Sequence, residues 1–289
     1  MERNVKAYAK LNLSIDVISK MENGYHSMRM VMQTVKFHDE IHIAVQPGEG
    51  IKIKTNLRYI PSDDRNIAVK AAKLFFEHTG ITGQGVSIDL KKNIPVCAGM
   101  GGGSSDAAAV LRALNDMFDT KLDREVLEEL SFSLGADVPF CIAGGTALAE
   151  GAGEILTDLP SLPPCSIVIC KPAISISTPT LFSNIDCNKI QIHPDTEGII
   201  KALEDGSLTE VARRMYNVFE TVLPKGADDV AEIKAKLLDF NALGTTMTGT
   251  GSAVFGIFDD PDAANAAYQE LKSSYRECHL TEAMGRLDV

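Results

Sequence analysis

Glycine is concentrated at one point of the chain, directly before a helical pattern. Four of the ten residues from Gly99 to Ala108 are glycine. Glycine loses more conformational freedom on folding than any other residue, so such a cluster destabilises the chain unless the backbone must adopt positive φ angles or approach another group closely. The cluster therefore predicts a structured loop in which side chains would be in the way.

A helix is expected to begin at the end of this cluster. Apolar residues from Ala107 to Phe118 recur with helical spacing, and Ser104 and Ser105 precede them at the position of an N-cap. The N-terminal end of a helix has unpaired N–H groups and about half a positive charge, so it binds anions. Asp106 would repel a phosphate there unless its carboxylate points away or binds a metal. We therefore predict an anion-binding loop, with a flexible serine-capped loop as the alternative.

The better-known signatures of phosphate binding are absent from the sequence. It contains neither the GxxxxGK[ST] motif of P-loop enzymes nor the GxGxxG fingerprint of dinucleotide-binding domains. The HRD and DFG motifs of protein kinases are missing as well. A phosphate site at the glycine cluster therefore belongs to another class.

Charge and composition restrict the partners of the protein. The chain has 289 residues, enough for one large or two ordinary domains, and a net charge of −11. This charge argues against nucleic acid or an anionic membrane as the main partner, but allows a small anion at a local positive site. The six cysteines form no CxxC pair, which disfavours a zinc site. Since there is no signal-peptide pattern and no apolar run of about 20 residues, we expect a soluble cytoplasmic protein.

Strand and helix patterns follow one another without strict alternation. Strands are expected at 9–17, 28–37, 39–45, 50–55, 85–95, 144–154 and 165–170, and a strand–turn–strand unit at 245–258. Further helices are expected at 63–80, 123–134, 195–206, 230–240 and 261–275, and a turn at Asn23–Gly24. This order favours an α+β fold. Three prolines within 159–164 indicate a linker, which divides the chain into domains at 1–158 and 159–289.

The glycine loop resembles the phosphate-binding loop of the GHMP small-molecule kinases, and other segments support the resemblance. AYAKLNLSIDV at 7–17 and MTGTGSAVFGIF at 247–258 match further motifs of that superfamily in the expected order. NGYHSM, LGADVPF and ISISTPTLF are similar to the branch that phosphorylates a diphosphocytidyl polyol in the non-mevalonate isoprenoid pathway. The resemblance implies a two-domain GHMP kinase fold, with an N-terminal ribosomal-protein-S5-like α/β domain and a C-terminal ferredoxin-like α+β domain.

The resemblance also implies an activity. This is the ATP-dependent phosphorylation of the 2-hydroxyl of 4-diphosphocytidyl-2-C-methyl-D-erythritol, a small-molecule partner. ATP is the expected cofactor together with Mg²⁺, for which the sequence identifies no ligand. Two alternatives stay open: a GHMP kinase for another small alcohol, such as homoserine or a mevalonate derivative, and a nucleotide-binding module that lacks catalysis.

Lys10 and Asp137 are the candidates for catalysis. Asp137 lies in a loop between Gly135 and Pro139, where the resemblance implies the base; a turn aspartate bonded to its own backbone is the alternative. Lys10 shares the polar face of an expected half-buried strand with Asn12, a pattern that usually means a solvated lysine. The resemblance implies instead that Lys10 stabilises charge on the acceptor oxygen.

The resemblance further implies two sets of binding residues. The nucleotide would contact Asn66, Ile67, Lys92, Pro95, Gly99, Gly101, Gly102, Gly103, Ser104 and Ser105. The acceptor would contact Asn12, Tyr25, His26, Thr178 and Phe182, since aromatic rings stack on a base. A second glycine turn from Thr248 to Ser252 would approach the diphosphate of the acceptor, with an ordinary hairpin turn as the alternative.

Overall fold

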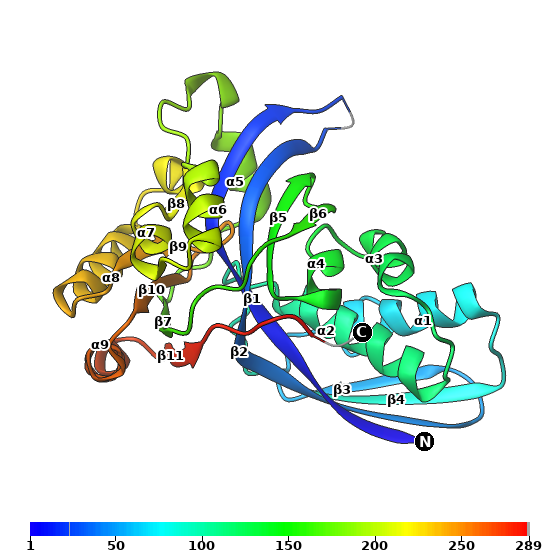
Figure 1. Ribbon diagram of the computed structural model, residues 1–289. Coiled ribbons are helices and arrows are strands. Elements are labelled where there is room, and N and C mark those ends of the chain that lie inside the picture. Colours follow the sequence, from blue (N-terminus) through cyan, green and yellow to red (C-terminus); the bar gives the residue numbers. More distant parts are fainter. Residues whose placement is uncertain (23, 288–289) are drawn as a thin grey trace.

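Two lobes joined by a pair of long strands make up the computed structural model, which describes residues 1–22 and 24–287 (Figure 1). The long strands, β1 (Glu2–Lys20) and β2 (His26–Pro47), pair antiparallel over almost their whole lengths. The two strands expected at 28–37 and 39–45 are therefore one continuous strand. The turn expected at Asn23–Gly24 involves residue 23, which lies outside the described residues.

The first sheet forms the N-terminal lobe and has seven strands within the described part of the chain. Its order is β3-β4-β2-β1-β8, and β5 pairs with β2 and β6 with β5. These strands are β3 (Ile51–Thr55), β4 (Gln84–Lys91), β5 (Thr146–Gly151), β6 (Ile155–Asp158) and β8 (Tyr216–Asn217). β8 comes from the second half of the sequence and pairs parallel with β1, so it attaches that half to the N-terminal sheet.

Among the described residues, four helices belong to this lobe (Figure 1): α1 (Ile67–Thr79), α2 (Gly102–Met117), α3 (Arg124–Phe132) and α4 (Val138–Ala143). Helix α2 packs on β1 and β2, α1 packs on α2 and β3, and α3 and α4 pack on each other and on α2. The alanines from Ala107 to Ala109 are fully buried, and their small size lets α2 lie close to its neighbours. Within residues 1–22 and 24–287, no helix has the length and apolar character required to cross a bilayer.

The second sheet forms the C-terminal lobe and is antiparallel, with the order β11-β7-β10-β9. Its strands are β7 (Ser166–Lys171), β9 (Gly244–Met247), β10 (Val254–Phe258) and β11 (Glu277–Glu282). The lobe also contains α5 (Thr178–Asn184), α6 (Thr196–Glu204), α7 (Leu208–Arg213), α8 (Asp228–Asp239), α9 (Pro261–Ser274) and the 3-10 helices η1 (Cys187–Lys189) and η2 (Val218–Val222).

Both faces of this second sheet are buried. Along β7, Ile167 and Ile169 pack with α6 and α7, whereas Val168 and Cys170 pack with α8 and α9. A strand that is buried on both faces shows an uninterrupted apolar run in place of alternation. The apolar pattern at 165–170 therefore predicted the strand correctly.

The α+β class and most of the expected elements are confirmed, and the missed elements are short. The helices expected at 63–80, 123–134, 195–206, 230–240 and 261–275 correspond to α1, α3, α6, α8 and α9. The sequence patterns did not reveal α4, α5, α7, β6, β8 or β11. These elements have two to seven residues, too few to show a period, so their conformation depends on packing against longer elements.

The start of α2 differs from the prediction. Its N-cap is Gly101, with a left-handed φ of 66°, and not Ser104 or Ser105. A Cβ at Gly101 would lie 2.9 Å from Cγ of Lys10, so a serine would be excluded there by both its φ angle and its side chain. The helix therefore begins among the glycines, and both serines lie in its first turns.

The polar face of β1 is buried, contrary to the expectation of a half-buried strand. Lys10, Asn12, Ser14 and Asp16 are between 0% and 6% exposed. The second glycine turn lies against this face, and the N–H group of Gly249 donates to the side chain of Asn12. A polar side chain in such a place requires partners, so this face of β1 is a candidate for function and not a solvated surface.

The segment expected as a linker lies against the first sheet. Leu162 is 6% exposed, and its N–H group donates to Oγ1 of Thr146 at 3.2 Å. The end of the chain also returns to the N-terminal lobe, where single bridges join Ala283 to Val35 and Arg286 to Gly144. A domain boundary between 158 and 159 stays a prediction.

The two glycine loops pack backbone against backbone. A Cβ at Gly99 would lie 2.1 Å from the carbonyl oxygen of Thr248, and a Cβ at Gly249 would lie 2.7 Å from Cα of Gly99. Both glycines also have positive φ angles, 74° and 58°. Glycine is thus required at both positions for the contact between two loops that are far apart in the sequence.

The contact between the two loops can be tested by comparing the stability of the Gly99→Ala variant with that of a Gly80→Ala control. Gly80 has a similar φ of 68°, but a Cβ there would meet open space. We expect the Gly80 variant to lose about 1 kcal/mol of unfolding free energy from its φ angle alone. The Gly99 variant should lose more than about 3 kcal/mol, because its methyl group displaces the backbone of the other loop. Urea denaturation measures both, and equal losses would contradict the close contact.

Candidate functional site

Two hollows meet at the glycine loop, residues 97–104. The helix-end hollow, about 500 Å³ in volume, lies between this loop and the start of α1. The interlobe hollow, also about 500 Å³, lies between the loop, β1 and the C-terminal lobe. Both are lined by Cys97, Gly99, Gly101 and Ser104. The glycine loop is therefore a shared wall at which groups bound in the two hollows can meet.

The helix-end hollow brings together nine of the ten residues expected to contact a nucleotide. These are Asn66, Ile67, Lys92, Pro95, Gly99, Gly101, Gly102, Gly103 and Ser104. The first N–H groups of α2 have no acceptor within the helix, as at any helix start. A Cβ on Gly102 would lie 3.1 Å from Cγ2 of Ile94, so the absence of a side chain lets the helix start approach the floor of the hollow. The arrangement is suited to binding an anion.

Ser105 does not line the hollow, in contrast to the prediction. It is 2% exposed, its Oγ donates to the carbonyl of Gly102 at 2.9 Å, and its N–H group donates to the carbonyl of Gly101 at 2.8 Å. Both donors are used inside α2, because the helix begins before the serines. Ser104, one position earlier, lines both hollows.

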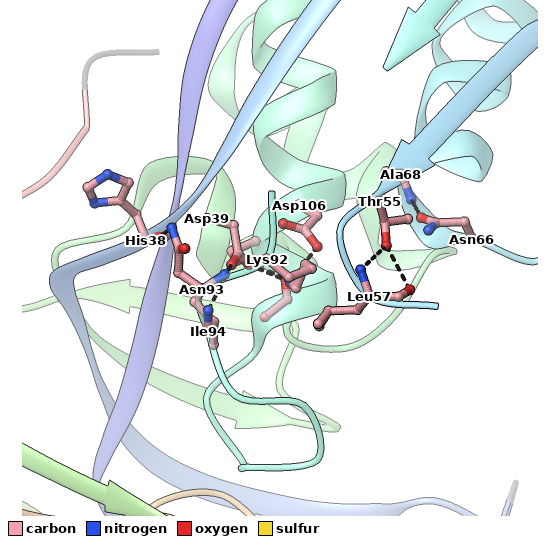
Figure 2. A network of polar contacts seen from close by, with 12 residues as sticks. His38, Asp39, Thr55, Leu57, Asn66, Ala68, Lys92, Asn93, Ile94 and Asp106 are labelled. Carbon is pink, nitrogen blue, oxygen red and sulfur yellow. Dashed lines mark hydrogen bonds and ion pairs between the residues drawn. The ribbon is translucent and has the colours of Figure 1, made fainter. Parts of the chain in front are cut away.

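Asn66 lies at the helix-end hollow, but its side chain binds its own loop. Its Oδ1 accepts the N–H group of Ala68 at 3.0 Å, and its Nδ2 donates to the carbonyl of Pro61 at 2.8 Å. The first of these bonds caps α1 and is drawn in Figure 2. A ligand in the hollow would therefore meet Ile67 and the capped start of α1.

Lys10 and Asp137 lie side by side in the interlobe hollow. Nζ of Lys10 is 3.3 Å from Oδ2 of Asp137. The side chain of Lys10 is 4% exposed and that of Asp137 is 34% exposed, so the carboxylate is accessible to a ligand and the ammonium lies behind it. Asp137 precedes α4 at the N-cap, yet its side chain makes no capping bond to the described residues. This geometry does not support a turn aspartate bonded to its own backbone.

Asn12 connects this ammonium to both glycine loops. Its Oδ1 accepts Nζ of Lys10 at 2.7 Å and the N–H group of Gly249 at 3.1 Å. Its own N–H group donates to Oγ1 of Thr248 at 3.1 Å, and that hydroxyl lies 3.2 Å from the carbonyl oxygen of Gly99. One buried amide side chain therefore fixes the position of Lys10 relative to the shared wall.

Aromatic side chains line part of the interlobe hollow. Tyr25, Thr178 and Phe182 line it, as expected for acceptor-binding residues, and Tyr25 is 60% exposed. His26 is not among the lining residues; its ring packs on Phe182, with centroids 4.9 Å apart. Phe182 also contacts the edge of Phe219. Since the rings of His26 and Phe182 already touch, a planar group would bind against their outer faces and not between them.

A buried ion network lies beneath the helix-end hollow (Figure 2). Nζ of Lys92 contacts Oδ2 of Asp39 and lies 2.6 Å from Oδ2 of Asp106. Oδ1 of Asp39 accepts the backbone N–H groups of Asn93 and Ile94. Lys92 is one of the residues expected to contact the nucleotide, but its ammonium is already paired with two carboxylates.

Burial and pairing set the protonation of this network. Burial alone would lower the pKa of the Lys92 ammonium, but the carboxylates of Asp106 and Asp39 outweigh it, so this pKa is raised and Lys92 is charged. Burial raises the pKa of the Asp106 carboxyl well above its usual range, although Lys92 opposes the effect. The network therefore holds one permanent cation and a carboxyl that binds a proton more readily than an exposed aspartate does.

Sequence reasoning missed several residues that hold the site. Asp39 lies within β2 between His38 and Glu40, and these polar neighbours gave no signal that its carboxylate is buried. Asn217 donates to the carbonyls of Met247 at 2.7 Å and Gly249 at 2.8 Å, which fixes the second glycine turn. Cys97 lines both hollows with a positive φ of 54°. Neither Asn217 nor Cys97 had a sequence signal, because their roles depend on contacts between segments far apart in the chain.

No group of three His, Cys, Asp or Glu side chains is arranged to hold a metal ion among the residues that the structure describes.

Family models match both halves of the chain. The model described as GHMP kinases N terminal domain matches residues 66–145, and the model described as GHMP kinases C terminal matches residues 199–277. The first range contains the glycine loop, Lys92 and Asp137. The two matches therefore cover the glycine loop and most of the helix-end hollow, whereas β1, β2 and the segment around Thr178, which line the interlobe hollow, lie outside them.

Individual proteins are similar to the chain over nearly its whole length. A 4-diphosphocytidyl-2-C-methyl-D-erythritol kinase of Clostridium kluyveri is 46% identical over 281 residues, which cover 97% of this chain and 99% of that protein. A solved structure of a 4-(cytidine 5'-diphospho)-2C-methyl-D-erythritol kinase has a TM-score of 0.82 and 33% identity, and the match covers 99% of this chain and 100% of that one. A homoserine kinase of Cytophaga hutchinsonii has a TM-score of 0.76 at 20% identity over 99% and 95% of the two chains, which shows a shared fold alone.

Asn12→Ala tests how the buried ammonium is held. The change removes an acceptor of Lys10 and of the N–H group of Gly249, so we expect a loss of about 2–3 kcal/mol in unfolding free energy. Asn4→Ala provides the control at an exposed position of the same strand, where we expect a change below about 0.5 kcal/mol. Urea denaturation measures both variants. Similar small effects would contradict the connecting role of Asn12.

Proposed function

We propose that this chain, which belongs to the GHMP kinases and among them to the 4-diphosphocytidyl-2-C-methyl-D-erythritol kinases, transfers the terminal phosphoryl group of ATP to the 2-hydroxyl of 4-diphosphocytidyl-2-C-methyl-D-erythritol. This is a kinase step of the non-mevalonate isoprenoid pathway. One observation carries the proposal: the glycine loop lines both hollows, and Lys10 and Asp137 lie together in one of them.

ATP would occupy the helix-end hollow. Its phosphates would lie along the segment from Gly101 to Ser104, where the N-terminus of α2 supplies N–H donors and positive potential. Its adenine would lie toward Asn66, Ile67 and Pro95, which line the same hollow. The terminal phosphate would then reach the shared wall next to the interlobe hollow.

Asp137 and Lys10 would act on the acceptor hydroxyl. Asp137 accepts a hydrogen bond from this hydroxyl and takes its proton as the new P–O bond forms and the bond to ADP breaks. The transition state of phosphoryl transfer is loose, so orienting the hydroxyl is a large part of this role. Lys10 stabilises the negative charge on the attacking oxygen, an effect that typically contributes about 3 kcal/mol.

The aromatic part of the interlobe hollow suits the cytidine end of the acceptor. Tyr25 and Phe182 provide aromatic faces for the base, and His26 packs on Phe182 and would present a ring nitrogen to the edge of the base. The hydroxyl of Thr178 lies 2.7 Å from that of Thr250 and connects this part to the second glycine turn. Backbone N–H groups of this turn would approach the diphosphate.

Mg²⁺ would accompany ATP and be held mainly by phosphate oxygens and water. It would neutralise part of the phosphate charge and so ease the approach of the acceptor oxygen. The residues described here supply the anion site, the orientation of the acceptor hydroxyl and the exclusion of water.

A turnover assay with three acceptors tests the proposed function. With MgATP, we expect rapid phosphorylation of 4-diphosphocytidyl-2-C-methyl-D-erythritol and little of homoserine or mevalonate, because short alcohols leave the aromatic part of the interlobe hollow empty. Preference for a short alcohol would point to another GHMP kinase activity. ATP binding without turnover of any acceptor would point to a nucleotide-binding module.

Asp137→Asn should keep nucleotide affinity and reduce kcat by about 10²- to 10⁴-fold, because an amide orients the hydroxyl poorly and accepts no proton. Asp119→Asn, at an exposed turn, is the control and should leave kcat unchanged within about twofold. Steady-state kinetics and nucleotide titration measure the two effects. Normal turnover in the Asp137 variant would remove this residue from the mechanism.

Phe182→Ala should raise the KM for the cytidine substrate by about 10-fold or more and change the KM for ATP little, since stacking on a base contributes about 1–3 kcal/mol. Phe132→Ala is the control, because Phe132 is 40% exposed on α3 and lies outside both hollows. Equal changes in the two KM values of the Phe182 variant would rule out stacking on the base.

A further inference from the structure

Three charged side chains are buried behind the helix-end hollow, and their charges do not balance. Asp39, Lys92 and Asp106 are 0%, 8% and 3% exposed. When all three are ionised, the cluster carries one net negative charge. It adjoins the start of α2, because a Cβ on Gly102 would lie 3.2 Å from Nζ of Lys92. A negative cluster at this place opposes the binding of phosphate groups in the hollow.

One oxygen distinguishes Asp106 from Asp39. Oδ2 of each carboxylate binds Lys92, and Oδ1 of Asp39 accepts two backbone N–H groups (Figure 2). Oδ1 of Asp106 is buried and has no hydrogen-bond partner among the residues that the structure describes. A buried carboxylate oxygen without a donor disfavours the ionised form, whereas hydrogen bonds to the charged form favour it. Asp106 is therefore the member of the cluster that is suited to hold a proton.

We propose that Asp106 takes up a proton from solvent when the phosphate groups of the nucleotide bind, so that the Asp39–Lys92–Asp106 cluster is neutral behind the bound nucleotide. The inference rests on the proposed function, which places a nucleotide in the helix-end hollow. Asp106 is a positioning residue in this scheme, because it acts through Lys92 and the start of α2. On the sequence alone, the Asp106 carboxylate is expected to repel a phosphate. Once this side chain is protonated, it reduces nucleotide affinity little.

The groups around Asp106 support this assignment. Asp39 of β2 and Lys92, which follows β4, are the charges that act on it directly. Cys141 of α4 is within electrostatic reach, but burial raises the pKa of its thiol to about 12, so the thiol is neutral. On α1, Lys70 and Lys73 are exposed to solvent. The ring of His38 packs against Tyr8, away from the cluster (Figure 2).

The sign of the pH effect follows from linkage. The phosphate charges make protonation of Asp106 more favourable, so its pKa is higher in the complex than in the free protein. Below both pKa values Asp106 is protonated in both states, and it adds no pH dependence to nucleotide affinity. Between the two values binding takes up a proton, and affinity falls by up to about tenfold per pH unit as the pH rises. Burial raises the pKa of Asp106 in the free protein, so this window lies at a higher pH than it would for an exposed aspartate.

Calorimetry on the wild-type protein provides the first test. A non-hydrolysable ATP analogue with Mg²⁺ is titrated at each pH from about 6 to about 10 in two buffers that both hold that pH and differ in their enthalpy of ionisation. The difference in heat between the two buffers gives the number of protons taken up. We expect uptake that approaches one proton within the window and disappears below it. Binding without proton uptake at any pH would overturn the inference.

Asp106→Asn provides the second test, with Asp89→Asn as the control. Asparagine has nearly the same shape as aspartic acid but is permanently neutral, so the variant should lose the Asp106 proton uptake and keep a nucleotide affinity constant within about twofold over the window. At the alkaline end it should bind the analogue more tightly than the wild type does, a gain that structural damage would not produce. Asp89 is an exposed residue of β4, and its variant should follow the wild type. At each pH the affinity of the variant is divided by that of the wild type, so that the ionisation of the ligand itself cancels.

The outcomes separate the two proposals. If the wild type binds the analogue and the Asp106 variant shows the same proton uptake, the inference fails and the proposed function stands. If the wild type binds no nucleotide at all, the proposed function fails and the inference fails with it. If the Asp106 variant does not fold, as judged by circular dichroism, the wild-type calorimetry alone decides the question.

Discussion

The direct contact between two glycine loops is the constraint on which the site depends. Gly99 and Gly249 approach so closely that neither has room for a Cβ. The contact brings the start of α2, from the N-terminal half, against a turn of the C-terminal lobe. Asn12 of β1 then bonds to the second loop and to Lys10, so the ammonium of Lys10 is fixed relative to both. Changes to the backbone at this contact would therefore affect both hollows.

The two buried lysines of the site have different surroundings and different roles. Lys10 contacts a neutral amide and a carboxylate that is one-third exposed, so its charge is directed toward a ligand in the interlobe hollow. Lys92 lies between Asp39 and Asp106 in the interior, so its charge is used within the protein. A basic residue beside a phosphate site need not bind phosphate; it can instead control the charge of the carboxylates around it.

The division into two hollows matches the requirements of phosphoryl transfer. The donor and the acceptor must approach each other in line while water is excluded, and they must bind separately beforehand. The shared wall, to which Cys97, Gly99, Gly101 and Ser104 belong, is consistent with these requirements under the proposed function, because groups bound in the two hollows would meet there.

The sequence by itself determined the local elements and the kind of chemistry. The apolar spacing after Ala107 predicted α2, and the glycines before it indicated an anion site. Only the tertiary structure decided which side chains face a ligand: Ser105 bonds within its helix, Lys92 is paired with two carboxylates, and the polar face of β1 is buried. The physical reason is that periodicity shows which residues share a face but not what covers that face. The partner of Asn12 is Gly249, 237 positions away, and such a contact exists only once the two lobes have come together.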